Sequence, residues 1–171
     1  MFFLQRWICG LFCGEYKEEI NALRFALSKK ISLNIVKPPK PKKWITADEF
    51  YRLIEEQLPV SKETIRILGA EKYALLPDRA LFEFLKADLT DTIPYTNTYV
   101  CRNFALKLLG DFQIPDWDIF AVALIWANGH AFNLYVNQDK IIKYIEPQTD
   151  EVFLPSSSKG KRFNQIGLIF G

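Results

Sequence analysis

Histidine and cysteine are scarce in this chain. Its 171 residues include one histidine and three cysteines, Cys9, Cys13 and Cys101. A small, odd number of cysteines does not form a disulfide framework and favours a reducing compartment. Cys9 and Cys13 lie one helical turn apart, but a structural zinc site needs four ligands, and only Cys101 and His130 remain to complete one. We therefore expect no metal centre and no cofactor from the cysteines.

Strong charge and long apolar runs are also missing. The net charge is only +2, which gives no indication of a nucleic-acid-binding surface. The apolar stretch over residues 1–19 is interrupted by Gln5 and Arg6, whereas a membrane span needs about 18 apolar residues in succession. It also lacks the basic start and the cleavage site of a secretory signal. We expect this stretch to pack on the chain's own core or on a protein partner; an interfacial membrane anchor is the alternative.

Hydrophobic residues make up 49% of the chain and aromatic residues 15%, enough for a well-packed core. Residues 15–30 have the apolar spacing of a helix, and residues 31–36 that of a short strand. The next segment, KPPKPKKW at 37–44, is too rich in proline for a helix or a central strand and predicts an extended connector. The sequence thus predicts an N-terminal extension over 1–45 and a main domain over 46–171.

Helix signals follow the connector. Thr46 and Glu49 form a capping box for a helix that ends before Pro59. Ser61 is a second candidate cap, and residues 80–89 have a helical apolar face. Four strand-like runs follow from Ile119 on, and turn-forming segments separate most of them. Helices followed by an antiparallel sheet predict an α+β fold.

Cys101 lies in a predicted helix over residues 95–110. Asn97 or Thr98 is the expected N-cap, and Gly110 is expected to end the helix in the left-handed conformation. Cys101 would then occupy about the third helical position. Unpaired backbone N–H groups and the helix dipole stabilise a thiolate there.

His130 and Glu146 are predicted to face each other on one hairpin. His130 begins a strand, and Glu146 ends the next one. If residues 137–139 form the loop, His130 lies directly opposite Glu146, and Asn133 points through the other face. A loop with an even number of residues would separate the two side chains. The predicted contact between His130 and Glu146 therefore requires an odd number of loop residues.

A thiol, an imidazole and a carboxylate make a nucleophile, a base and an orienting group. We predict these roles for Cys101, His130 and Glu146, and the Cys101 backbone N–H is a natural oxyanion donor. Supporting roles fall to three other side chains: Asn97 as a second oxyanion donor, Gln148 as a rival orienting group, and Trp126 as a shield of the His–carboxylate contact from water.

A family resemblance rests on the strings YVCRNFALKLLGDF, GHAFNLYV and YIEPQTDEV, within residues 70–155. They resemble the C-terminal domain of the Marasmius oreades agglutinin and its prokaryotic and phage relatives. The resemblance implies a papain-like fold, in which N-terminal helices and the nucleophile helix pack on a C-terminal antiparallel sheet. It also implies a Cys–His–Glu triad at Cys101, His130 and Glu146.

One departure concerns calcium. The relatives carry acidic residues beside the nucleophile that are associated with a calcium requirement, but this chain has Arg102 and Asn103 there. Losing carboxylate ligands weakens a site for a hard cation. We therefore do not infer a calcium site from the resemblance, although Asp111 or Asp116 could contribute to a site.

The sequence favours a papain-like cysteine hydrolase, a peptidase acting on a peptide or protein substrate. The alternative is a non-catalytic structural or interaction protein with the same fold, such as a phage virion component. A third hypothesis, a peptidoglycan amidase or endopeptidase of the NlpC or CHAP type, lacks its usual Asp-Cys-Ser string here. A cytoplasmic or virion-associated location is expected.

Overall fold

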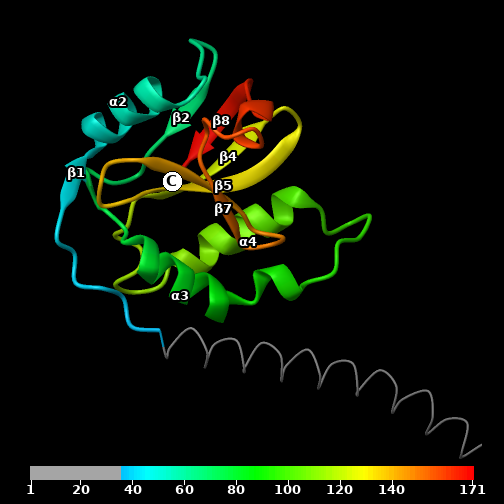
Figure 1. Cartoon of the computed structure of the whole chain (residues 1–171), viewed down its shortest axis with the longest axis horizontal. Helices are drawn as coiled ribbons and strands as arrows, with labels where there is room; N and C mark the ends of the chain where they lie inside the picture. Colours follow the sequence, from blue (N-terminus) through cyan, green and yellow to red (C-terminus); the bar gives the residue numbers. More distant parts are fainter. Residues whose placement is uncertain (1–35) are drawn as a thin grey trace, which may run out of the picture. The chain divides into compact units, whose positions relative to one another are not determined.

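The computed structural model describes residues 36–171, and Figure 1 shows their arrangement. Residues Lys37–Gly171 form one compact unit. The predicted helix over 15–30, the Cys9 and Cys13 pair and the proposed partner surface at the N-terminus lie outside the described residues. So does nearly all of the strand predicted over 31–36.

Helix α2 (Ala47–Gln57) confirms the local signals read from the sequence. The Thr46 hydroxyl accepts a hydrogen bond from the Glu49 N–H at 3.1 Å, as an N-cap should. The Glu49 carboxylate forms an ion pair with Lys140 rather than reaching back to Thr46. The helix ends one residue before Leu58, whose N–H still bonds to the Ile54 carbonyl.

Two sheets form the centre of the unit. A two-stranded sheet pairs β1 with β3 antiparallel, and a six-stranded sheet has the order β2-β8-β4-β5-β6-β7. In the larger sheet β2 and β8 are parallel and every other pair is antiparallel. The strands are β1 Trp44–Thr46, β2 Ile65–Ile67, β3 Lys72–Ala74, β4 Val122–Ala127, β5 His130–Val136, β6 Ile142–Glu146, β7 Glu151–Phe153 and β8 Ile166–Phe170.

Helices cover both faces of the larger sheet, with α2 on one side and α3 (Asp78–Asp88) and α4 (Cys101–Phe112) on the other (Figure 1). Phe132 and Leu134 of β5 share a core with Phe50 of α2. Asn133, between them in sequence, donates from Nδ2 to the Ala105 carbonyl of α4 at 3.0 Å. The alternation of side chains along β5 therefore separates two cores.

The predicted fold class, with N-terminal helices packed on a C-terminal antiparallel sheet, is wrong. Strands β1 to β3 lie among the helices of the N-terminal half, and β2 runs parallel to β8, so the sheet is neither purely C-terminal nor purely antiparallel. Ser61 opens a turn into β2 instead of a helix. Residues 65–67 extend because they pair with β8, and this long-range pairing overrides the local helix signal. The described chain is built mainly on β-sheet.

Helix α4 begins later and ends later than predicted. Its first residue is Cys101, with Val100 as N-cap, so Asn97 and Thr98 precede the helix. Asn103 accepts a hydrogen bond on Oδ1 from the Val100 N–H at 3.1 Å and so stabilises the N-terminus. The helix passes Gly110 and ends at Phe112. At 11 or 12 residues, none of the described α-helices is long and apolar enough to cross a bilayer.

Two fully buried tyrosines of the sheet provide a matched test of hydrogen bonding. Tyr135 donates to Asp78 at 2.9 Å, whereas the buried Tyr144 hydroxyl has no partner. An unpaired buried hydroxyl costs free energy. We expect Tyr144→Phe to raise the free energy of unfolding by about 1 kcal/mol and Tyr135→Phe to lower it by about the same amount. Urea unfolding measures both, and equal effects would contradict the assignment.

Candidate functional site

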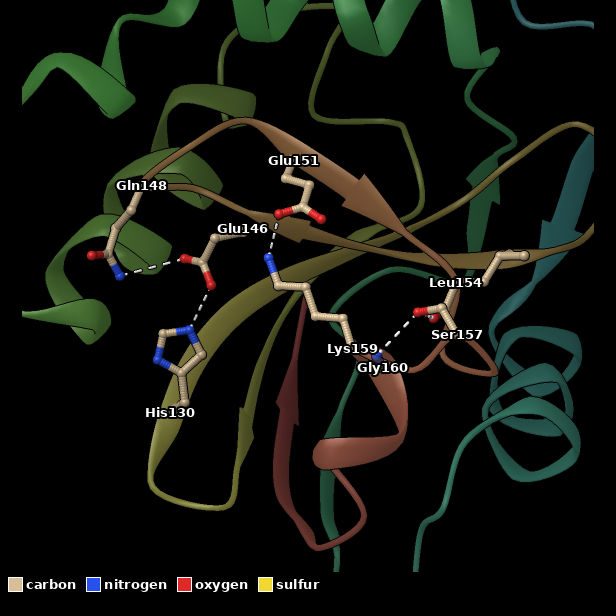
Figure 2. Close-up of polar contacts among 8 residues, drawn as sticks. All are labelled: His130, Glu146, Gln148, Glu151, Leu154, Ser157, Lys159 and Gly160. Atoms are coloured by element: carbon tan, nitrogen blue, oxygen red, sulfur yellow. Dashed lines mark hydrogen bonds and ion pairs between the residues drawn. The ribbon is translucent and has the colours of Figure 1, made fainter.

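His130 and Glu146 meet at the end of the larger sheet (Figure 2). His130 is the first residue of β5 and Glu146 the last residue of β6. The His130 Nε2 atom lies 2.7 Å from Glu146 Oε2. Because a carboxylate can only accept, Nε2 carries the proton of this bond. The Glu146 residue is 8% exposed, so the contact forms at a mostly dry site.

The hairpin reaches this contact through a register different from the predicted one. Val136 pairs with Ile142, which leaves a loop of five residues, 137–141. The predicted three-residue loop is wrong, but the number is odd, so both side chains still lie on one face. Asn137 explains the longer loop: its Oδ1 accepts from the N–H groups of Asp139 and Ile141, both at 3.0 Å. Continued pairing would place His130 opposite Gln148.

Gln148 donates a hydrogen bond to the Glu146 carboxylate and not to the His130 imidazole. Its Nε2 lies 3.4 Å from Glu146 Oε1, while His130 occupies Oε2 (Figure 2). Glu146 thus has a donor on each oxygen, which offsets the cost of burying its charge. The three side chains form one polar network at the start of the β6–β7 turn.

Aromatic rings other than Trp126 flank the His130 ring. The rings of Phe132 and Phe163 each stack with it, at centroid distances of 5.7 Å. Trp126 pairs with Ala131, so its side chain leaves the sheet on the opposite face from His130. The shielding predicted for Trp126 belongs to Phe132 and Phe163. No local signal marks Phe163, because it follows a short 3-10 turn far along the chain.

Cys101 lies in the first turn of α4, as predicted, and is partly buried. Within residues 36–171, no hydrogen bond joins its thiol to His130. Asn97 is exposed in the bend before the helix. The structure therefore brings together His130, Glu146 and Gln148 but does not bond the thiol to them. The roles of Cys101, His130 and Glu146 as nucleophile, base and orienting group stay a prediction.

The residues considered for a cation are engaged in other contacts or stand apart. Asn103 caps α4, and Asp111 forms an ion pair with Lys107 at 2.7 Å. Asp116 is exposed, with a left-handed backbone at φ 70°. Among the described residues, no group of three or more His, Cys, Asp or Glu side chains is placed to hold a metal ion.

No family model and no curated protein matches the sequence of this chain. Solved structures do match its fold. The PSL1a–E64 complex matches at a TM-score of 0.64 with 15% identity, covering 75% of this chain and 50% of that one. Polyporus squamosus lectin bound to the epitope Neu5Acα2-6Galβ1-4GlcNAc matches at 0.57 with 14% identity, covering 72% and 48%.

The second of these structures is named as a lectin. This fold comparison corrects the predicted resemblance to the protease domain of the Marasmius oreades agglutinin. The same matches correct the papain-like fold, the cysteine hydrolase function and the description as a phage or viral protein. A peptide substrate has no support in these matches. The chain spans about half the length of each lectin chain that it matches.

Proposed function

We propose that the protein is a non-catalytic carbohydrate-binding protein. The observation that carries the proposal is the fold shared with two lectin structures over about three quarters of the chain. One of those lectins is bound to a sialylated trisaccharide. The non-catalytic alternative raised by the sequence accords better with these neighbours than a hydrolase does.

The contacts of the polar network also support a structural role. A nucleophilic thiol is activated by a base within hydrogen-bond reach. Here no hydrogen bond within the described residues links Cys101 to His130. Glu146 instead joins the first residue of β5 to Gln148 beyond β6, with a bond on each oxygen. These bonds fix the β6–β7 turn on the end of the sheet.

Titration of the full chain with defined glycans tests the proposal. The probes are Neu5Acα2-6Galβ1-4GlcNAc and its asialo disaccharide Galβ1-4GlcNAc. We expect saturable binding of at least one of them, with a Kd of about 1 mM or tighter, by calorimetry or NMR shift perturbation. Cellobiose at the same concentrations is the control for nonspecific sugar effects. Absence of binding to both glycans would contradict the proposal.

Alkylation tests the non-catalytic half of the proposal. Iodoacetamide at neutral pH should modify Cys101 slowly, and at the same rate in His130→Ala, if the ring does not activate the thiol. Mass spectrometry of the tryptic peptide containing Cys101 measures the rate, with Cys101→Ser as the blank. Rapid labelling that His130→Ala or Glu146→Gln slows at least tenfold would show an activated nucleophile and overturn this half.

A further inference from the structure

Trp126 is an exposed tryptophan on the opposite face of the sheet from His130. Trp126 is the one exposed residue of β4; the other five are buried. Its residue is 38% exposed, although its strand lies inside the six-stranded sheet. Tryptophan is enriched at binding surfaces, because an exposed ring gains free energy when a ligand covers it.

Trp126 is one of the residues that line a hollow of about 430 Å³. This volume lies within the usual range of small-molecule sites. Its walls come from the segment after α2, the β4–β5 turn and the start of β8. The lining consists of Pro59, Ser61, Trp126, Asn128, Gly129, Asn164, Gln165, Ile166 and Gly167. None of these side chains is charged, so the hollow offers no ion pair to a carboxylate or an ammonium group.

Hydrogen bonds between its walls hold the hollow in shape. Asn128 donates to Asn164 Oδ1 at 3.1 Å and accepts from the Gln165 N–H at 2.9 Å. Across the hollow, the buried Thr64 hydroxyl donates to the Ile166 carbonyl at 2.7 Å and accepts from the Ser61 N–H at 3.0 Å. A site whose walls are already bonded together loses little conformational freedom when it binds a ligand.

Two amide groups on the wall are left for a ligand. In the part of the chain that the structure describes, no hydrogen bond engages Asn164 Nδ2 or the side-chain amide of Gln165. Both residues are exposed. Amides both donate and accept, which matches the hydroxyl groups of a sugar. A pyranose ring also has an apolar C–H face that packs on an aromatic ring.

We infer that the hollow at Trp126 binds a neutral pyranose, which stacks on the indole and is oriented by Asn164 and Gln165. This inference rests on the proposed function and gives it a place and a ligand class. Because the lining is uncharged, the hollow favours a neutral terminal sugar such as the galactose of Galβ1-4GlcNAc over a sialic acid.

Binding of Galβ1-4GlcNAc to matched variants tests the inference. Trp126→Ala should weaken binding at least about tenfold, the loss expected of an aromatic anchor. Trp44→Ala is the control, because Trp44 is 43% exposed on β1 and does not line the hollow. Trp126→Phe should retain part of the affinity, and Gln165→Ala should weaken binding by a few-fold. These two variants keep the test decisive if Trp126→Ala fails to fold.

The remaining outcomes separate this inference from the proposed function. Glycan binding that is unchanged in the Trp126 and Gln165 variants would overturn the site while leaving carbohydrate binding intact. Binding of the sialylated trisaccharide alone would overturn the neutral ligand class. A change only in self-association would assign Trp126 to a protein interface instead. Absence of glycan binding by the unaltered chain would remove the proposed function and the site together.

Discussion

Substitution of Gly160 by alanine should lower the free energy of unfolding by about 3 kcal/mol, the upper end of the usual cost of overpacking. Gly160 is buried at the start of a 3-10 turn, Gly160–Arg162. A Cβ atom there would lie 2.3 Å from the Leu154 carbonyl oxygen and 2.5 Å from that of Pro155. These are backbone atoms, so relief of the clash requires the turn itself to move.

The clash should also displace Phe163, whose ring flanks the His130 side chain. Phe163 bonds through its N–H to the Gly160 carbonyl at 3.0 Å and stacks on His130. Urea unfolding measures the stability, and the His130 ring proton shifts report the displacement of Phe163. Gly110→Ala is the matched control, since nothing lies within 4 Å of the new Cβ atom. Within α4, that change should stabilise by about 0.5–1 kcal/mol. A Gly160→Ala protein as stable as the unaltered chain would refute the close approach.

Replacement of Asp150 by asparagine should stabilise the protein by about 2 kcal/mol at pH 8. Asp150 is the last residue of the β6–β7 turn and has a left-handed conformation, φ 56°, which asparagine tolerates. Its Oδ1 atom is buried without a hydrogen-bond partner. Burial, and then the negative charge of Asp91, raise the pKa of Asp150 to about 7. In the unfolded chain the pKa is about 3.9.

The sign of the pH dependence follows from these two pKa values. Between pH 4 and pH 7 the folded state holds the proton more firmly than the unfolded state, so stability falls as the pH rises. Above pH 7 the loss is constant, and below pH 4 it vanishes. Thermal unfolding of Asp150→Asn and the unaltered chain should therefore converge near pH 4 and separate by pH 8. Asp91→Asn should give a smaller gain of the same sign. A difference independent of pH would contradict an ionising Asp150.

Sequence signals predicted those elements of the fold that depend on neighbours along the chain. Thr46 and Glu49 mark the start of α2 because an N-cap acts within one turn. The pairing of β2 with β8 was missed because its contacts join residues about a hundred positions apart. A three-residue strand carries too short a pattern to be recognised without its partner.

The same distinction applies to the candidate site. The parity of the β5–β6 hairpin predicted that His130 and Glu146 share a face, and this holds for any odd loop. The loop length itself depends on the Asn137 side chain, which bonds its own turn and adds two residues. The stack of Phe163 on His130 depends on packing between distant segments. The bond between Gln148 and Glu146 joins side chains two residues apart and depends on the conformation of the β6–β7 turn.

The place of β8 in the sheet has a consequence for synthesis on the ribosome. Strand β8 lies between β2 and β4, so β2 has no strand partner until residues 166–170 have left the exit tunnel. At translation rates of about 5–20 residues per second, Ile65 and Ile67 stay unpaired for about 5–20 s. Both side chains are apolar, and β2 is a sheet edge even in the finished unit. The nascent chain is thus most open to misassociation at β2, where a chaperone would have its longest opportunity to act.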